Sequence, residues 1–123
     1  MHPHEKLDVW KMSIEMVTSI YEITKTFPSD ERFGLVSQIR RAGVSVPANI
    51  AEGAARQSDK EFCQFLSIAQ GSASELETEL FIAKNLGYMS CQDYERNYEE
   101  INVIARMLIG LSKTVRSRSR IGS

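Results

Sequence analysis

The chain has 123 residues, of which 42% are hydrophobic and 25% are charged, and it contains only 7 glycines and 3 prolines. This composition excludes a disordered, collagen-like or low-complexity chain, and a chain of this length can bury about two thirds of its surface around one core. No apolar run approaches the ~20 residues of a membrane span, and the first residues lack the apolar stretch of a signal peptide. We therefore expect one cytoplasmic globular domain in which the two cysteines, Cys63 and Cys91, stay unpaired.

The net charge of −1 hides an uneven distribution of charge along the chain. Residues 1–112 hold 11 basic and 16 acidic residues, a net charge of −5, whereas residues 113–123 hold four basic residues and no acid. Such a segment is typical of a solvated, disordered end, and it can also meet an anionic partner. We expect a bundle domain over 1–115 and a basic, disordered tail over 116–123.

Apolar residues recur with helical spacing over 7–27, where they form two stripes about 120° apart. One stripe holds Leu7, Trp10, Ile14, Val17 and Tyr21, and the other holds Val9, Met16, Ile20, Ile23 and Phe27. Because one stripe is enough to join a bundle, the second needs another cover, either a neighbouring helix or another copy of the chain. The sequence predicts that Met16, Ile20 and Ile23 of the second stripe contact another subunit.

A second helix is predicted over 33–53, with Ser29 or Asp30 as its cap. Its apolar face is Phe33, Val36, Ile39, Gly43, Val46, Ile50 and Gly53. Pro47 lies inside this pattern, removes one backbone donor and crowds the carbonyl of Gly43. Because a glycine can absorb that distortion, we expect one kinked helix rather than two.

The third helix begins after Ser58, because Ser58 and Glu61 form a capping box, and it ends before Gly87. Its core stripe is Phe62, Leu66, Ala69, Ala73, Leu76, Leu80 and Ala83. A fourth helix with one apolar face over 94–115 follows a short turn. Long helices joined by short connections predict an all-α, up-down-up-down four-helix bundle with a Pro-kinked second helix.

The third helix carries a second stripe that combines apolar residues with two carboxylates. Its members are Ile68, Ser72, Glu75, Glu79, Ile82 and Leu86. Two like charges four residues apart repel each other, and cations facing them would offset that cost. Glu75 and Glu79 therefore form either a solvated edge or part of a subunit contact with Ile68 and Ile82, and the pattern leaves both alternatives open.

Catalytic chemistry has few candidates in this sequence. The only histidines are His2 and His4, so the body of the domain offers no imidazole base or metal ligand. The chain has no glycine-rich phosphate loop and no metal-binding motif, and Cys63 has no histidine partner. Glu75 and Glu79 lack a third acid or base that would assist catalysis. We expect no catalytic residue, no cofactor and no metal site, and a protein that is not an enzyme.

Basic residues concentrate around the second helix and the turn after it, where five cations face two acids. Adjacent Arg40 and Arg41 point about 100° apart on a helix, so at least one is available to phosphate or carboxylate. Glu52 stands four residues before Arg56 and can occupy that cation in a local pair. Asn49, at the edge of the core, is expected to satisfy backbone groups near the kink rather than to bind a ligand.

A family resemblance rests on the stretch Ser45-Val-Pro-Ala-Asn-Ile-Ala-Glu-Gly53, with Arg32-Phe-Gly-Leu before it and Phe62-x-x-Phe65-Leu66 after it. Over about residues 5–112 the chain resembles the four-helix-bundle proteins encoded in intervening sequences of large-subunit ribosomal RNA genes. The resemblance implies a homo-oligomer, typically a pentameric ring, without an established catalytic activity. It also implies similarity to the accessory protein of diversity-generating retroelements, a pentamer that binds nucleic acid and a reverse transcriptase. Gly43, where a slightly larger residue is usual, and the basic tail depart from the family pattern.

The charge pattern and the resemblance together predict a non-catalytic homo-oligomeric adapter that associates with RNA or DNA, or with a reverse-transcriptase-like protein. The alternative is an oligomeric scaffold that binds only protein. The expected nucleic-acid-binding residues are Arg40, Arg41, Arg56, Lys60, Lys113, Arg116, Arg118 and Arg120. The expected subunit-interface residues are Met16, Ile20, Ile23, Ile68, Glu75, Glu79 and Ile82.

Overall fold

The computed structural model describes residues 2–122, apart from the side chains of Lys6 and residues 119–122. Within that range the chain forms four α-helices and no strand. The helices are α1 (Asp8–Thr24), α2 (Leu35–Ala54), α3 (Asp59–Asn85) and α4 (Cys91–Gly122), with short 3-10 helices η1 (Pro3–Lys6) before α1 and η2 (Ser29–Glu31) before α2. The all-α prediction is therefore confirmed.

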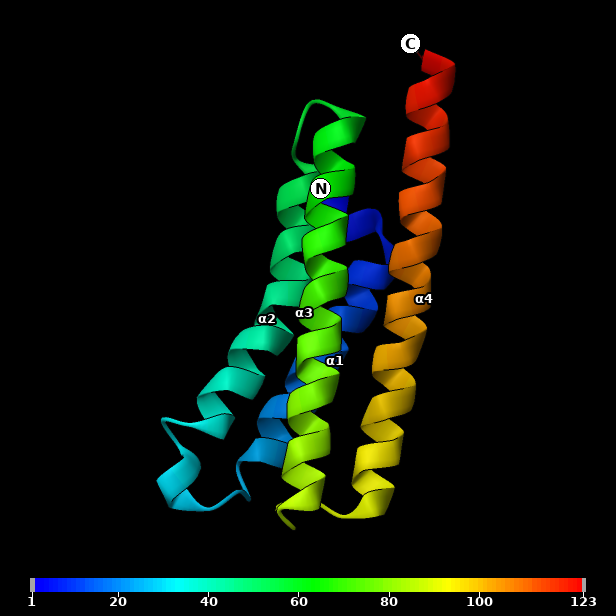
Figure 1. Ribbon diagram of the computed structural model, residues 1–123. Helices are drawn as coiled ribbons and strands as arrows, with labels where there is room; N and C mark the ends of the chain where they lie inside the picture. Colours follow the sequence, from blue (N-terminus) through cyan, green and yellow to red (C-terminus); the bar gives the residue numbers. More distant parts are fainter. Residues whose placement is uncertain (1, 123) are drawn as a thin grey trace.

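Consecutive helices run in opposite directions, so the bundle is up-down-up-down as predicted (Figure 1). α2 lies between α1 and α3, and α4 lies between α3 and α1. The α2–α3 turn lies at the same end of the bundle as the N-terminal segment and the last turns of α4 (Figure 1). Residues far apart in sequence, such as Asp59 and Arg118, therefore meet at this end.

Local sequence signals set both ends of α3. Ser58 caps α3 by accepting a 3.1 Å hydrogen bond from the Glu61 amide, as the capping box predicts. Gly87 follows the end of α3 with a φ of +80°, a conformation that glycine adopts without strain. The start of α2 differs from the prediction, because Ser29 and Asp30 belong to η2 and a glycine precedes the helix instead.

α2 passes through Pro47 without interruption, so one helix and not two spans this segment. Pro47 is buried, as is Gly43 four residues earlier. Toward its Leu35 end, α2 leans away from α3 (Figure 1). A kink localised at Pro47 stays a prediction.

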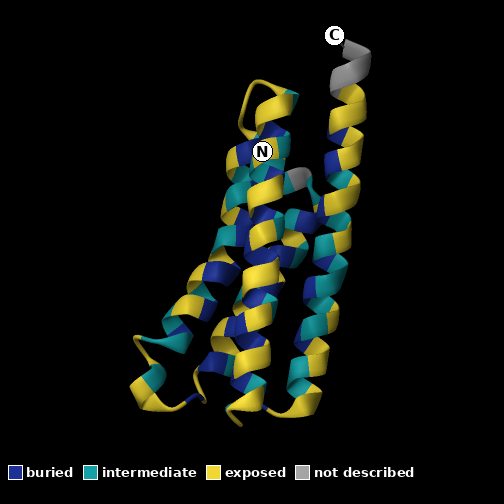
Figure 2. Cartoon of the chain, in the orientation of Figure 1, coloured by how far each residue is buried: buried dark blue, intermediate teal, exposed yellow. Residues whose placement is uncertain are grey.

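The core runs along the bundle between the four helices, and Figure 2 shows the buried residues on their inward faces. Its largest wholly buried side chains are Met16, Ile20, Ile39, Val46, Ile50, Leu66, Leu76, Leu80, Ile104, Leu108 and Val115. Burying one side chain of this size stabilises the fold by about 1.5–3 kcal/mol. Each of the four helices contributes to this set, so the helices hold one another in place.

The second apolar stripe of α1 lies in the core of the chain, and part of the first stripe is exposed. Met16 and Ile20 are fully buried in the chain's own core, whereas Ile14 and Tyr21 of the other stripe are 40% and 38% exposed. Because α1 contacts α2 and α4, these neighbours cover the second stripe without another copy. The prediction that Met16 and Ile20 contact another subunit is therefore wrong, and Ile23 is half-buried against the core.

α4 continues beyond the boundary expected at residue 115. After Val115 the sequence has neither proline nor glycine before Gly122, and arginine and serine are tolerated in a helix. Residues 116–118 therefore extend α4 instead of starting a disordered tail. The side chain of Arg120, one of the expected nucleic-acid contacts, lies outside the described residues.

Candidate functional site

An open hollow with basic walls lies on the outer side of α1 and α2. Its lining residues are Tyr21, Arg32, Phe33, Val36, Ser37, Arg40, Arg41 and Val44. Three of these eight described residues are arginines and none is acidic, although the chain as a whole carries a net charge of −1. The hollow therefore concentrates positive charge on one face of a slightly acidic molecule.

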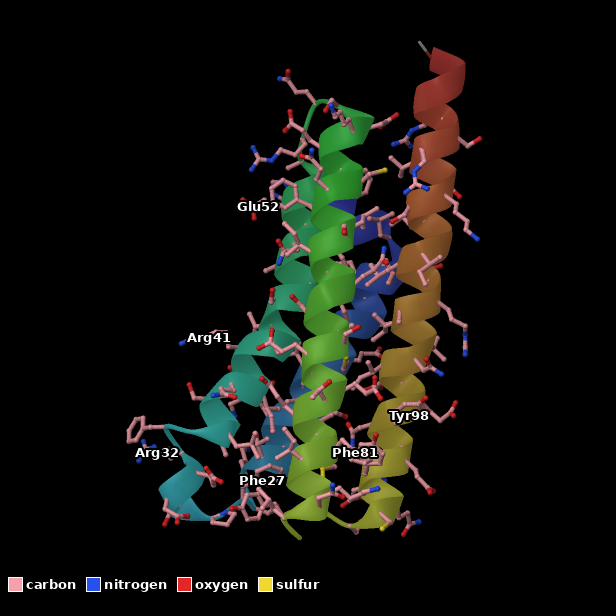
Figure 3. All side chains as sticks on the ribbon, viewed as in Figure 1. Phe27, Arg32, Arg41, Glu52, Phe81 and Tyr98 are labelled. Carbon is pink, nitrogen blue, oxygen red and sulfur yellow. The ribbon has the colours of Figure 1, made fainter. Side chains whose placement is uncertain are left out.

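The two adjacent arginines of α2 have different environments in this hollow. Arg40 is half-buried, donating from Nε to Thr24 Oγ1 at 2.9 Å and from Nη2 to the Tyr21 carbonyl at 3.3 Å, and its guanidinium lies 4.4 Å from the centre of the Tyr21 ring. Arg41 is exposed and projects away from the bundle (Figure 3). The helical spacing predicts that at least one of the two arginines is available to an external anion, and the more available one is Arg41.

Phe33 is the most exposed large apolar side chain described, at 88%. The apolar spacing predicts that Phe33 lies on the inward face of the second helix, and that prediction is wrong. α2 begins only at Leu35, so the helical spacing does not reach Phe33 and its ring lies outside the core. The guanidinium of Arg32 is 5.5 Å from the centre of this ring. The glycine after Phe33 is the signal in the sequence that could have indicated a break here.

The other expected cations lie at the opposite end of the bundle, near the α2–α3 turn and the last turns of α4. They are Arg56, Lys60, Lys113, Arg116 and Arg118. Arg56 lies 3.2 Å from Glu52, which confirms the predicted local pair, and 3.9 Å from Glu61. Arg118 is paired with Asp59 at 2.8 Å. Acidic neighbours therefore occupy two of these five cations, and Lys60, Lys113 and Arg116 are exposed without an ion pair among the described residues.

The outer face of α3 carries the remaining residues that the sequence assigned to a subunit contact. Ile68 and Ile82 are 50% and 44% exposed, and Glu75 is exposed beside them. Glu79 is buried, and its Oε1 has no hydrogen-bond partner among the described residues. Burial, together with the carboxylate of Glu75, raises the pKa of Glu79 to about 7. The alternative of a solvated edge therefore fails for Glu79.

A row of small polar side chains joins α2 to α3 beside this face. Asn49 donates from Nδ2 to the Ser45 carbonyl at 2.7 Å and to Ser45 Oγ at 2.9 Å. The hydroxyls of Ser45 and Ser72 lie 2.8 Å apart across the two helices. Asn49 therefore satisfies a backbone group two residues before Pro47, as predicted, and its amide nitrogen is occupied within the chain.

Histidine and cysteine, two residue types that often serve as metal ligands, are few in this chain. His4 packs edge-on against Trp10, with ring centres 4.9 Å apart. Cys63 and Cys91 are both free thiols, as predicted. In the part of the chain that the structure describes, no three His, Cys, Asp or Glu side chains gather in a way that could hold a metal ion. Among the same residues, no helix has the length and apolar character required to cross a bilayer.

The fold and these surfaces define an antiparallel four-helix bundle with a basic hollow on one side. The chain belongs to the 23S rRNA-intervening sequence protein family, whose family model matches residues 5–110. A solved structure from Bacteroides thetaiotaomicron VPI-5482, of a protein with unknown function from the S23 ribosomal protein family, is similar to this chain, with a TM-score of 0.80. The two chains are 30% identical, and the match covers 85% of this chain and 98% of the other. No curated protein matches this chain.

These comparisons confirm the family resemblance drawn from the sequence. Neither description names a catalytic activity, a ligand or a partner.

Proposed function

We propose that this protein is a non-catalytic homo-oligomeric adapter that associates with nucleic acid, or with a nucleic-acid enzyme, through basic residues. The observation that carries the proposal is the hollow beside α2, where three arginines surround a cavity with no acid among its described lining residues. Clustered cations attract phosphate, and each phosphate contact releases a condensed counterion. Membership of a family described by an rRNA intervening sequence supports the same proposal.

Arg32 and Arg41 are the phosphate contacts in this proposal. Both are exposed and lie on the same outer side of the bundle (Figure 3), and among the described residues neither takes part in an ion pair. Arg40 instead holds α2 against α1, because its guanidinium already donates hydrogen bonds to Thr24 and Tyr21. Lys60, Lys113 and Arg116 supply further exposed charge at the other end of the bundle.

In an assembly of several copies of the chain, the electrostatic fields of the basic hollows would add together. A symmetric ring repeats each hollow once per subunit, so several weak phosphate contacts act on one nucleic-acid strand. The exposed face of α3 with Ile68 and Ile82 supports a contact between copies, because two half-exposed isoleucines on one helix leave apolar surface that a second copy can cover. The expected ring of five comes from the family resemblance.

A protein-only scaffold is the second candidate function. It is favoured by the net charge of −5 on residues 1–112, because an acidic body repels nucleic acid wherever the basic surfaces are not in contact. Binding measured against salt concentration separates the two candidates, since only phosphate contacts make the affinity fall with a fixed power of the salt concentration.

The test is fluorescence anisotropy with a labelled RNA of about 20 nucleotides at two salt concentrations, near 50 and 200 mM. Replacing Arg32 and Arg41 together by glutamine should weaken binding and reduce the slope of log affinity against log salt by about two. The matched control replaces Arg96 and Arg106, exposed cations of α4 outside both basic groups, and it should leave the slope close to that of the wild type.

Two results would favour the protein-only scaffold. One is the absence of wild-type binding in low salt at tens of micromolar protein. The other is a variant of Arg32 and Arg41 that binds as tightly as the wild type with the same salt slope. Light scattering on each variant shows whether its assembly state has changed, so that a loss of binding can be attributed to the arginines.

A further inference from the structure

The ring of Phe33 is exposed at a position where packing within the chain gives no reason for an aromatic residue. Its side chain is 88% exposed and lies outside the hydrophobic core. A single exposed apolar side chain is ordinary on a protein surface, but this one borders a hollow with three arginines. The ring and the cations therefore share one surface.

The segment that carries Phe33 is held at both ends. Two residues before it, Glu31 accepts a hydrogen bond from the Tyr88 hydroxyl at 2.9 Å and lies 3.4 Å from the Leu35 amide. The first contact fixes the segment to the α3–α4 turn and the second fixes it to the start of α2. Phe33 thus projects from a short, tethered connection between η2 and α2, so little ordering is needed when a ligand meets the ring.

The surroundings of the ring combine an apolar surface with positive charge. Val36 and Val44 line the hollow with the ring, and Arg32 and Arg41 supply guanidinium groups from the same outer side of α2. Aromatic rings beside arginines are the arrangement with which proteins bind single strands, because bases stack on the rings while the backbone phosphates meet the cations.

We propose that Phe33 is a stacking platform for an unpaired base of a single-stranded nucleic acid whose neighbouring phosphates contact Arg32 and Arg41. This inference rests on the proposed function and adds a substrate class to it. A duplex presents a denser row of phosphates, so a surface that used charge alone would bind the duplex at least as well. Its bases are already stacked on one another, however, and offer no face to Phe33. Stacking therefore favours the single strand.

The test compares binding of a labelled single-stranded oligonucleotide of about 20 uridines with binding of a mixed-sequence RNA duplex of the same length. The wild type should bind the single strand more tightly than the duplex. Phe33→Leu, which keeps an apolar side chain but removes the ring face, should weaken single-strand binding by roughly 5- to 150-fold for each stacked base. Duplex binding and the salt slope should change less than about twofold, because the arginines remain.

Phe81→Leu is the matched control, because Phe81 is also an exposed ring beside a cation, with Lys84 Nζ 4.6 Å from the ring centre. It lies on α3, outside the hollow, and should leave single-strand binding unchanged. Phe33→Tyr, which retains a ring face, should restore single-strand affinity to within a few-fold of the wild type.

Each other outcome identifies which proposal has failed. If the wild type binds neither probe, both the proposed function and the stacking role fail. If the wild type binds but Phe33→Leu binds the single strand equally well, the stacking role fails and the arginine contacts remain. If Phe33→Leu instead lowers the assembly mass in light scattering, the ring is a contact between copies of the chain and the stacking proposal is overturned.

Discussion

Arg118 and Asp59 form a two-point contact between the last turns of α4 and the first turn of α3. Arg118 Nε donates to Asp59 Oδ2 at 3.2 Å, and Nη2 donates to Oδ1 at 2.8 Å. Such a fork fixes the geometry of both side chains. The hydrogen bond from Arg118 also holds the pKa of Asp59 below its ordinary value of 3.8. Arg118 thus fastens α4 to α3, and this pairing makes it less available to an external anion than its place in the basic segment predicts.

Removing this contact should loosen the end of α4 and leave the rest of the bundle intact. Asp59→Asn is expected to speed amide hydrogen exchange over residues 116–118, with little change in thermal unfolding, because the pair lies on the surface. The control Glu61→Gln, on the same turn of α3, should leave that exchange unchanged. Because the pKa of Asp59 is lowered in the fold, its carboxylate stabilises the contact at pH values above 3.8. This stabilisation is lost as the pH falls below 3.8 and through the lowered pKa, so acidification should have the same local effect as Asp59→Asn. Unchanged exchange in Asp59→Asn would show that the contact does not hold the helix end.

Two glycines of α2 are expected to respond in opposite ways to replacement by alanine. A Cβ on Gly43 would lie 4.0 Å from methyl groups of Ile20 and Val17, which is ordinary contact. Gly43→Ala should therefore stabilise the fold by about 0.5–1 kcal/mol, because glycine inside a helix loses more backbone entropy on folding. A Cβ on Gly53 would lie 2.7 Å from Phe65 Cβ and 3.0 Å from Phe62 Cδ1. Gly53→Ala should destabilise by roughly 1–3 kcal/mol.

Urea denaturation followed by circular dichroism measures both changes, and each variant serves as the control for the other. A stabilised Gly53→Ala would mean that α2 and α3 are less closely packed at this end than the distances indicate. A destabilised Gly43→Ala would mean that the glycine relieves crowding around Pro47, and would support the predicted kink.

The features that the sequence predicted correctly depend on residues three or four positions apart. The Ser58 cap, the Glu52 pair with Arg56 and the Asn49 contact with Ser45 each join residues within one helical turn. Helix geometry alone brings such residues together, so spacing in the sequence is sufficient to predict them.

The features that the sequence did not predict depend on where the neighbouring helices lie. Both stripes of α1 are apolar, and only the positions of α2 and α4 decide that Met16 is in the core while Ile14 is exposed. Arg40 and Arg41 are adjacent in the sequence, yet a hydroxyl 16 residues away determines which one is held. Phe33 lies outside the core because of a break in the helix, which its apolar spacing concealed.

Glu79 should make the stability of the fold decrease as the pH rises toward neutrality. Its pKa is about 7 in the folded chain against an ordinary value of 4.5, so the folded state binds the proton more tightly than the unfolded state. The resulting stabilisation is fully present below about pH 4.5 and is lost as the pH rises through 7. Glu79→Gln cannot ionise and should be more stable than the wild type near pH 8 by up to about 3 kcal/mol, the free energy that corresponds to this shift of the pKa.

Urea midpoints of the wild type and of Glu79→Gln across pH 5 to about 8 check this prediction, because the two curves should converge on the acid side. Glu95→Gln, an exposed replacement of the same type on α4, controls for the change in net charge. Parallel curves for wild type and Glu79→Gln over this pH range would contradict the prediction. They would show that the Glu79 carboxyl has a similar pKa in the folded and the unfolded chain. A cation from a second copy of the chain facing Glu79 would produce that result, so the measurement should be repeated at several protein concentrations.

The exposed face of α3 should hold copies of the chain together, whereas the inner face of α1 should hold each copy folded. A glutamate introduced at Ile68 or Ile82 stays in water in the monomer, because these side chains are 50% and 44% exposed. It becomes a buried charge only when a second copy covers the face, at a cost of several kcal/mol. Ile68→Glu and Ile82→Glu should therefore shift the mass measured by light scattering to that of the 13.9 kDa chain while the helical circular dichroism is retained.

Ile20→Glu should have a different effect, because Ile20 is fully buried inside the monomer. An unpaired charge at that position costs a large part of the ~5–15 kcal/mol that stabilises a typical domain, so the helical signal itself should be lost. Ser67→Glu, at an exposed position about 100° around α3 from Ile68, adds the same charge outside the apolar face and should leave the mass unchanged. If the wild type is monomeric at micromolar concentration, or if Ile68→Glu and Ile82→Glu keep the wild-type mass, then this face of α3 is not the contact between copies. In that case the contact between copies is expected on the surface of α1 that carries Ile14 and Tyr21, its exposed large apolar residues.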